Sequence, residues 1–244
     1  EWVSPLYSKS NTLYYRQLVK DENSNIVDKS FIIMSNDTPI LAFLCALLTK
    51  KDKTDLIYYK IPCLLIHNSK FSSNTIFNLF LKEFEKIKQK SNGKTIIRDD
   101  LINGQLSFLT NYLLSNGATS KTIFSNIINL NEDVKTLKQN VRKSYKSLIN
   151  WGERELNLKI FNYKNTTKKE IEIFRELHYH VSNKRTRSYN SWLKNFESIM
   201  HNESFMIFGY KEQTPITAGL FTLNDKHCYY GISASKREYF DKPI

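Results

Sequence analysis

A short polar segment carries the side chains best suited to bind a negatively charged group. It runs from Ser182 to Ser188 and reads SNKRTRS, between two stretches with helical patterning. From a connecting loop, Lys184, Arg185 and Arg187 can converge on one anion, and arginine offers the paired donors that phosphate and carboxylate accept. A merely solvated loop explains the same residues equally well. The segment is therefore a candidate anion site, with both interpretations open.

A second set of polar side chains lies on a predicted strand and just after it. The strand reads YYGISAS, and alternate residues of a strand face opposite sides. Ser233 and Ser235 therefore share a face, where their hydroxyls can bind hydroxyl or amide groups of a substrate. Tyr230 either joins them or packs in the core. Lys236 and Arg237 follow directly and can meet an anion at the end of the strand.

Other kinds of chemistry find less support. The sequence has no G-x-S-x-G elbow and no cysteine with a histidine partner nearby in sequence, which disfavours a hydrolase triad. His178 and His180 form an H-x-H pair on a predicted helix, where residues two apart point to different faces. We expect one of these rings to be partly buried and the other exposed, and we predict no metal site. No catalytic residue is assigned.

Two helices are predicted to position the basic segment. The first spans about residues 167–181 and the second about residues 190–200, and apolar residues recur in both at the spacing of one helical face. The residues expected to pack inward are Ile171, Phe174, Leu177 and Val181 on the first helix, and Trp192, Phe196 and Ile199 on the second.

A third, basic helix is predicted upstream. Asn131, Glu132 and Asp133 mark its start and Gly152 its end. The expected apolar stripe consists of Val134, Leu137, Val141, Tyr145 and Leu148, and beside it lie Lys135, Lys138, Arg142, Lys143 and Lys146. These cations form either a solvated face or a phosphate-binding face.

One sequence motif occurs twice in the chain and predicts the architecture. SFIIMSNDTPI begins at Ser30 and SFMIFGYKEQTPI at Ser204, and each precedes a strand with paired tyrosines, LIYYKIPCLLI or CYYGISAS. Each copy predicts a hairpin and a third strand. After the first copy, a helix that begins near Ser72-Ser73-Asn74 and a strand KTIIRDD follow.

The repeat predicts an α+β fold of tandem units, each a mainly antiparallel mixed sheet flanked by helices. We place the first unit at residues 1–125 and the second at residues 126–244. By analogy with the first copy, a helix and a strand should come after Ile244, so the second unit is expected to be incomplete at its C-terminus.

Composition limits the class of protein and its partners. The 244 residues are 41% hydrophobic and 25% charged, which suits a globular protein with a real core. The longest apolar run, Ile40 to Leu48, is too short to span a bilayer. The net charge of +12 suggests nucleic acid, a phosphorylated substrate or an acidic membrane face as partner, although Lys- and Asn-rich coding explains it too. Cys45, Cys63 and Cys228 are expected to be reduced core thiols of a cytoplasmic protein.

Several stretches together resemble the FemAB-like branch of the GNAT acyltransferase superfamily. They are SFMIFGYKEQTPITAGLF, YYGISASKREYFDKPI, the helix VRKSYKSLINWG, and ELHYHVSNKRTRSYNSW. The last looks like the family's helix, basic loop and aromatic residue that shape the acceptor cleft, which adds Trp192 to the candidate site. The basic helix departs from the family pattern, because Ser147-Leu148-Ile149-Asn150 stands where an Arg/Lys-Lys-Ala run is common.

The resemblance implies transfer of an acyl or aminoacyl group to an amine of a cell-wall precursor or surface sugar. The donor would be aminoacyl-tRNA or acyl-CoA, with no tightly bound cofactor, and the acceptor an anionic nucleotide-linked or lipid-linked precursor. The chain lacks the Arg/Gln-x-x-Gly-x-Gly/Ala loop that cradles the coenzyme A pyrophosphate in ordinary GNAT enzymes. Alternatives are an acyl-CoA-dependent N-acyltransferase acting on a nucleotide-sugar, and a non-catalytic nucleic-acid-binding module. The expected location is the cytoplasm, with possible peripheral contact at the inner membrane face.

Overall fold

The computed structural model describes residues 4–67, 73–101 and 104–239. Contacts between Cα atoms divide the chain into two units. Unit 1 contains residues 12–121, and unit 2 contains residues 4–11 and 122–244 where they are described. The first helix, α1 (Lys9–Asp21), therefore contributes its first turn to unit 2 and its remainder to unit 1.

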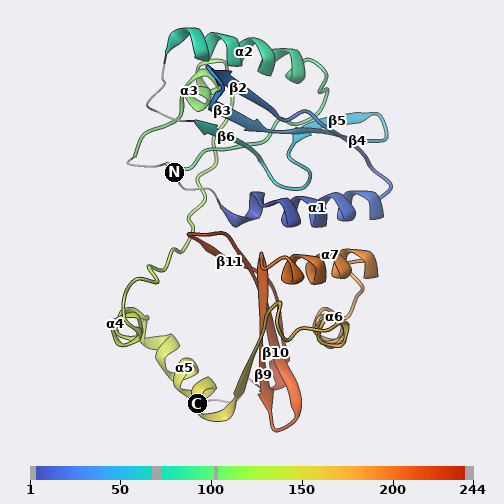
Figure 1. Cartoon of the computed structure of the whole chain (residues 1–244), viewed down its shortest axis with the longest axis vertical. Coiled ribbons are helices and arrows are strands. Elements are labelled where there is room, and N and C mark those ends of the chain that lie inside the picture. The colour runs from blue at the N-terminus through green and yellow to red at the C-terminus, as the bar shows by residue number, and fades with distance from the viewer. Residues whose placement is uncertain (1–3, 68–72, 102–103, 240–244) are drawn as a thin grey trace. The chain divides into compact units, whose positions relative to one another are not determined.

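Unit 1 is built on two small sheets (Figure 1). One has the strand order β2-β3-β6-β7, antiparallel except for the parallel pair β6 and β7, and the other has the order β1-β4-β5. The strands are β1 (Asn25–Asp28), β2 (Phe31–Ser35), β3 (Thr38–Leu44), β4 (Ala46–Lys50), β5 (Lys53–Ile57), β6 (Cys63–His67) and β7 (Ile97–Arg98). The helices after β6 are α2 (Asn74–Lys88) and α3 (Phe108–Ser115).

Helix α2 confirms the predicted helix after the first copy of the repeat and supplies the core of unit 1. Ser73 caps it by accepting a hydrogen bond from the backbone N–H of Ile76 at 3.3 Å. Phe80 and Phe84 are fully buried against Phe43 of β3, with ring centroids 5.4 and 5.8 Å from the Phe43 centroid. This aromatic cluster holds the helix on the four-stranded sheet.

The second and third strands expected in the first copy are each broken. The chain leaves the larger sheet at Cys45, between β3 and β4, and returns to it through a turn in which Tyr58 bridges Ile61. Tyr59 has a φ of 54°, which a strand does not accommodate. The pair Tyr58-Tyr59 is thus buried in a turn, whereas the tyrosine pair of the second copy lies on a strand.

Unit 2 has one antiparallel sheet with the strand order β11-β10-β9-β8. Its strands are β8 (Asn157–Phe161), β9 (Ser204–Lys211), β10 (Thr214–Leu223) and β11 (Cys228–Ser235). Its helices are α4 (Val134–Asn140), α5 (Lys143–Glu155), α6 (Lys168–Ser182) and α7 (Tyr189–Met200), with short 3-10 turns η1 (Pro5–Tyr7) and η3 (Arg237–Tyr239).

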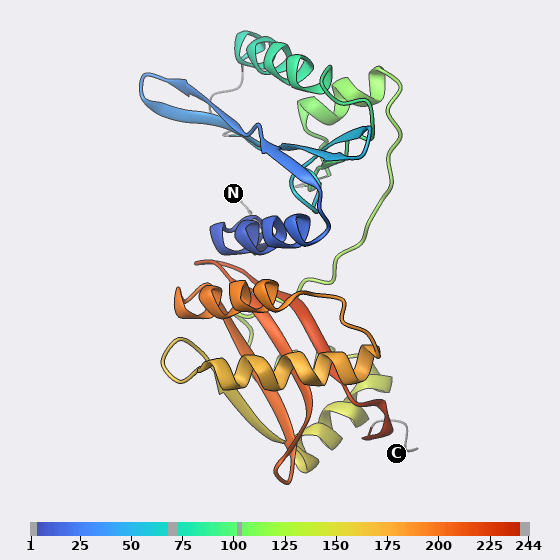
Figure 2. The same ribbon diagram turned by 90° about the vertical axis from the view of Figure 1, so that its right-hand side faces the viewer.

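Helices α6 and α7 lie together on one face of this sheet, and α4 and α5 lie on the other side (Figures 1 and 2). Helix α6 packs against β10 and β11, and α7 packs against β9. Both confirm predicted helices. Helix α6 starts with a capping box, in which the backbone N–H of Lys169 donates to Thr167 Oγ1 and the backbone N–H of Thr167 donates to Glu170 Oε2.

The prediction of one continuous basic helix is wrong, because the structure divides this stretch into α4 and α5. Val141 and Arg142 between them are extended, with ψ of 134° and 136°. A β-branched residue at this point lowers helix propensity. Lys146 Nζ donates to the carbonyl of Gln139 at 3.0 Å, which satisfies an acceptor left free at the end of α4.

The two copies of the repeated motif do form equivalent hairpins. Strands β2 and β3 pair through a turn with positive φ at Asn36 and Asp37, and β9 and β10 through a turn with positive φ at Glu212. Six residues after the shared Pro, the first copy breaks at Cys45 and the second has a register shift before Phe221. The helix and strand expected after Ile244, and residues 241–244 themselves, lie outside the described residues.

The three cysteines have different environments. Cys45 and Cys63 are fully buried, as expected, but Cys228 is exposed, so its prediction as a core thiol is wrong. Among the described strands, β11 lies at the edge of its sheet and pairs with β10, so Cys228 at its start has a strand on one side. Within the described residues, no helix is long and apolar enough to cross a membrane.

This difference predicts selective reactivity of the thiols. Burial raises the pKa of Cys45 to about 12 and that of Cys63 well above its usual range, which removes the reactive thiolate. Desolvation raises the pKa of the Cys228 thiol as well, but its side chain is exposed, so a thiol reagent should modify Cys228 in the native protein and all three cysteines after unfolding. Mass spectrometry of Cys228→Ser should then show no fast modification; rapid labelling of Cys45 in that variant would contradict the fold of unit 1.

Candidate functional site

The basic segment joins α6 to α7 as a tight, exposed loop. Helix α6 ends at Asn183, which has the left-handed φ of 51°, and α7 begins after Ser188, whose hydroxyl accepts from the backbone N–H of Ser191 at 3.1 Å. Lys184 and Arg185 are exposed. Both ends of the loop are thus fixed by helix caps, which limits the positions its side chains can take.

Arg187 is held by the core of unit 2. Its Nη1 lies 2.7 Å from His178 Nε2. Because a guanidinium can only donate, His178 accepts through Nε2 and is neutral, with its proton on Nδ1. The His178 ring packs on Trp192 at 5.6 Å between centroids, and Trp192 packs on Phe174 at 5.2 Å. A series of edge-to-face ring contacts therefore supports the histidine that positions this arginine.

Arg185 is held on a different side of α6. Its guanidinium carbon lies 5.5 Å from the centroid of the Tyr179 ring, at cation–π distance. Since successive residues of a helix point about 100° apart, Tyr179 and His178 direct the two arginines differently. Residues of α6 hold both arginines: His178 contacts Arg187, and Tyr179 contacts Arg185. The two guanidinium groups therefore have separate contacts.

A depression of about 640 Å³ lies along α6, and its lining includes Tyr179, the residue that Arg185 contacts. The loop end, α6 and the ends of two strands form its wall, through Lys169, Glu172, Ile173, Glu176, Leu177, Tyr179, His180, Asn183, Pro215 and Lys236. Lys236 is thereby brought near Tyr179 and the basic loop. Glu172 and Glu176 are each paired with Arg175, at 2.9 and 2.8 Å. This one guanidinium offsets part of the negative charge of the two carboxylates, and Lys169 and Lys236 add positive charge to the wall.

The strand residues proposed for the site lie elsewhere. Ile232 and Ala234 of β11 are buried on the face that α6 covers, so Ser233 and Ser235 face the opposite side of the sheet. Ser235 Oγ lies 2.7 Å from Thr217 Oγ1, and Tyr230 is 58% exposed.

The remaining two candidate residues, Arg237 and Trp192, differ in exposure. Arg237 is exposed in the η3 turn, whereas Trp192 is only 2% exposed and lies beneath the loop as a support for His178. The structure therefore places Lys184, Arg185 and Arg187 on the α6–α7 loop and Lys236 in the wall of the depression, and it separates Tyr230, Ser233 and Ser235 from them.

Sequence reasoning missed the side chains that order the arginines. His178 and His180 were predicted to be one partly buried and one exposed, and this is confirmed. The bond from Arg187 to His178 was not foreseen, nor was the stacking of Arg185 on Tyr179. The available signal was the His-Tyr pair in the last two turns of a helix directly before a basic loop, within side-chain reach of it.

Lowering the pH should destabilise unit 2 through His178. Burial and the charge of Arg187 lower its pKa below the usual 6.5, so the unfolded chain binds the proton more readily than the native state. The stability from this group is complete above pH 6.5 and is lost as the pH falls toward the lower native pKa. His178→Gln should flatten the dependence of the melting temperature on pH, whereas equal flattening by the exposed control His180→Gln would contradict this origin.

The fold belongs to a recognisable class of architecture. Each unit is a mainly antiparallel α+β sheet flanked by helices, and the two occur in tandem with related hairpins, which confirms the predicted fold class. The crystal structure of FemX matches it with a TM-score of 0.62 and 7% sequence identity, covering 99% of this chain and 81% of that chain. No protein-family model and no curated protein matches the sequence. At this identity the likeness concerns the fold, and the chain has the tandem fold of FemX.

Proposed function

We propose that this protein transfers an acyl or aminoacyl group to an amine of a cell-wall precursor or surface sugar. The observation that carries the proposal is the positioned Arg187 on a FemX-like fold. The FemAB-like enzymes that the sequence resembles perform this chemistry with aminoacyl-tRNA as donor. The alternative donor is acyl-CoA, whose acyl group would be transferred to the amine of a nucleotide-sugar.

The reaction makes simple demands on the protein. The neutral amine of the acceptor attacks the ester carbonyl of aminoacyl-tRNA or the thioester carbonyl of acyl-CoA. The new C–N bond forms as the C–O or C–S bond breaks, and the amine proton ends on the leaving oxygen or sulfur or in water. No covalent enzyme intermediate is needed. The protein must hold the two substrates in line and stabilise the oxyanion that develops.

The α6–α7 loop supplies the first of these needs, a grip on an anionic acceptor. Arg187 is preorganised by His178, so little conformational entropy is lost when it binds a phosphate. Lys236 lines the depression and Arg185 lies over Tyr179 of its wall, so both add positive charge at this end of α6. A charge-assisted, bidentate contact of this kind contributes about 1.5–3 kcal/mol.

Thermal stabilisation by a ligand panel tests the proposal. We expect UDP-linked cell-wall precursors to raise the melting temperature and Arg187→Ala to weaken their binding by about 10- to 100-fold. Arg185→Ala should have a smaller effect. Arg154→Ala provides a matched control, because Arg154 lies on α5 and its side chain is 66% exposed.

Other members of the panel separate the alternatives. Charged tRNA and acyl-CoA compared side by side identify the donor. If only bulk RNA raised the melting temperature, and Arg185→Ala and Arg187→Ala did not change this effect, the protein would be a non-catalytic nucleic-acid-binding module rather than a transferase.

A further inference from the structure

A stretch of unit 2 exposes an unusual amount of apolar surface. Residues 121–129 form neither helix nor strand, and large apolar side chains between residues 123 and 134 lie in solvent. The most exposed are Phe124 at 92%, Ile127 at 80% and Ile123 at 78%. Ile128, Leu130 and Val134 are each 67–70% exposed. Single exposed apolar residues are common, but six within twelve positions mark an interaction surface.

The spacing of these residues is that of an amphipathic helix, although the segment is not helical here. Ile123, Ile127, Leu130 and Val134 follow each other at i, i+4, i+7 and i+11. At 100° per residue these four fall within about 60° of one another. Phe124 and Ile128 widen the same face to about 160°; Asn131 falls within it, and Ser125, Asn126 and Asn129 fall outside it. The segment can therefore gather its apolar side chains on one face by folding into a helix.

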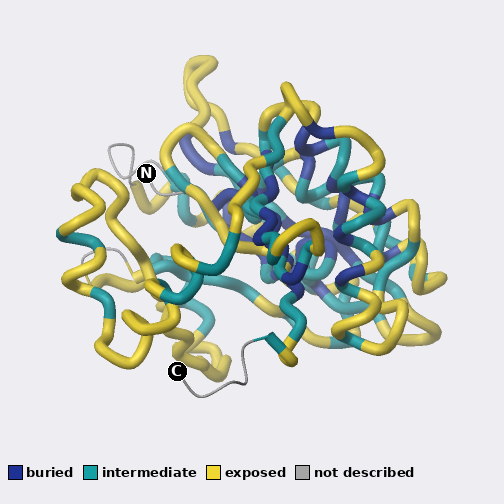
Figure 3. The backbone as a smooth tube through the Cα atoms, turned by 90° about the horizontal axis from the view of Figure 1, so that it is seen from below, coloured by how far each residue is buried: buried dark blue, intermediate teal, exposed yellow. Residues whose placement is uncertain are grey.

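Cations lie directly beside this apolar segment. Residues 134–152 contain five, Lys135, Lys138, Arg142, Lys143 and Lys146, and no aspartate or glutamate. Glu132 and Asp133 precede them, so residues 122–149 carry five cations against two acids. Helices α4 and α5 bury none of their residues, and Figure 3 shows this part of the tube exposed almost throughout. Lys138 reaches Glu153 at 2.5 Å, in a solvent-exposed pair that contributes little to stability.

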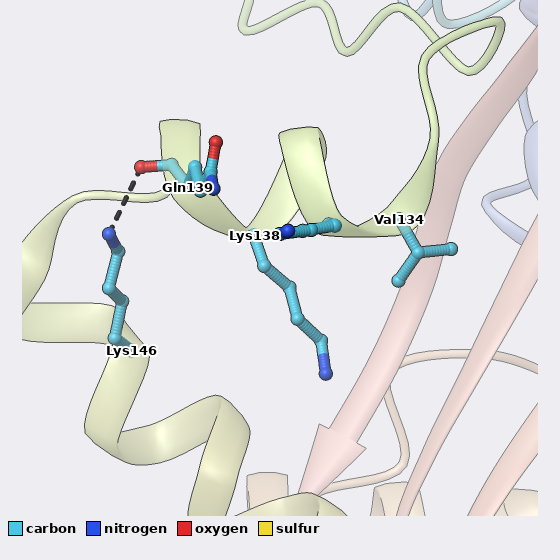
Figure 4. Close-up of a pocket in the computed structure, with 5 residues that line it drawn as sticks. Val134, Lys138, Gln139 and Lys146 are labelled. Carbon is cyan, nitrogen blue, oxygen red and sulfur yellow. Dashed lines mark hydrogen bonds between the residues drawn. The ribbon is translucent and has the colours of Figure 1, made fainter.

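The stems of three lysines form an apolar hollow next to Val134. It measures about 480 Å³ and is lined by Val134, Lys135, Lys138, Gln139 and Lys146. Figure 4 shows Lys146 directed to the backbone of Gln139, with Val134 at the far end of α4. The lysine stems thus lie on an apolar surface, while the ammonium group of Lys146 donates to Gln139 and that of Lys138 pairs with Glu153.

We propose that residues 122–149, the basic-apolar segment, bind the surface of an anionic lipid bilayer. A bilayer interface accepts apolar side chains and cations at the same time, the former among acyl chains and the latter among phosphates. RNA would use the cations, and Phe124 and Tyr145 could stack on bases, but the four isoleucine and leucine side chains would stay in water. A protein partner would have to supply both a groove and several carboxylates.

On binding, residues 122–134 should fold into a helix that lies in the plane of the interface. The backbone N–H and C=O groups of the extended segment would then be paired, as an apolar environment requires. Lys135, Lys143 and Lys146 would contact headgroups. This surface is separate from the α6–α7 loop, and the inference does not rest on the proposed transferase activity.

Co-sedimentation of the whole chain with vesicles tests the inference. We expect binding to phosphatidylcholine vesicles that contain phosphatidylglycerol, weakening with salt, and little binding to phosphatidylcholine alone. Lys135→Gln, Lys143→Gln and Lys146→Gln together should lower the partition coefficient about 100-fold, at about fivefold per cation. Phe124→Ser with Ile127→Ser should lower it at least about tenfold. Both side chains are exposed, so the fold should not suffer.

Matched variants and a second readout decide between lipid and other partners. Lys50→Gln, Lys51→Gln and Lys53→Gln remove the same charge from exposed positions of unit 1 and should change binding little. Hydrogen exchange should show new amide protection across residues 122–134 on anionic vesicles. Three results would overturn the inference. The first is binding that does not depend on lipid charge, and the second is an equal loss of binding in the variant with Lys50, Lys51 and Lys53 replaced. The third is displacement of the protein from vesicles by RNA, together with no effect of the Phe124 and Ile127 substitutions.

Discussion

Phe84→Ala is expected to lower the free energy of unfolding of unit 1 by about 3–5 kcal/mol. The ring is fully buried and stacks on Phe80 at 6.0 Å with an interplanar angle of 12°. It also contacts Phe43 edge-on, so one deletion weakens the attachment of α2 to the larger sheet. A cavity lined by aromatic rings collapses poorly, which places the cost toward the upper end of that range. Denaturant unfolding, with hydrogen exchange of α2 to locate the change, measures it.

Leu79→Ala is the matched control for this prediction. Leu79 lies on the same helix but is 48% exposed, so its truncation should cost roughly 1 kcal/mol or less. If the two variants were equally stable, the Phe80–Phe84 face of α2 would not be the one that packs on the sheet.

Trp192→Ala should destabilise unit 2 by a similar amount, about 3–5 kcal/mol. The indole is 2% exposed, and its neighbours Phe174 and His178 both come from α6. Its removal also withdraws the support of His178 and, through it, of Arg187. We therefore expect a lower melting temperature together with weaker binding of anionic ligands. Trp192→Phe should retain most of both properties, because a smaller ring still fills part of the site.

An exposed aromatic residue on the same helix separates packing from ligand contact. Tyr189 is 47% exposed at the start of α7, and Tyr189→Ala should leave the unfolding midpoint of unit 2 nearly unchanged. A Trp192→Ala protein with normal stability and no ligand binding would show instead that the indole reaches the ligand directly, as the family resemblance suggested.

The helices of this fold are readable from sequence because their signals are local. Ser73 before α2, and Thr167 with Glu170 at α6, are caps whose partners lie within a few residues. The break at Val141 is harder, since each half of the basic stretch keeps helical spacing. The path of the chain at Cys45 and Tyr59 was not predictable, because it depends on pairing with a second sheet that the repeat itself does not contain.

The candidate site shows the same limit at the level of side chains. The cations Lys184, Arg185 and Arg187 stand out in sequence, and the structure places them on an ordered loop. The residues that order them were not identified, since His178 and Tyr179 matter through distances that spacing does not reveal. Ser233 and Ser235 looked like neighbours of Lys236, yet the alternation of β11 sends them to the opposite face of the sheet.

Transfer of a labelled aminoacyl group tests the central claim most directly. The whole chain is incubated with tRNA charged with a labelled amino acid and with a UDP-linked cell-wall precursor, and the acceptor amine is analysed for a new amide. The predicted result is label on the acceptor, at a rate reduced about 10- to 100-fold in Arg187→Ala and unchanged in Arg154→Ala. Absence of transfer from both charged tRNA and acyl-CoA, in a protein that binds RNA independently of Arg187, would contradict it.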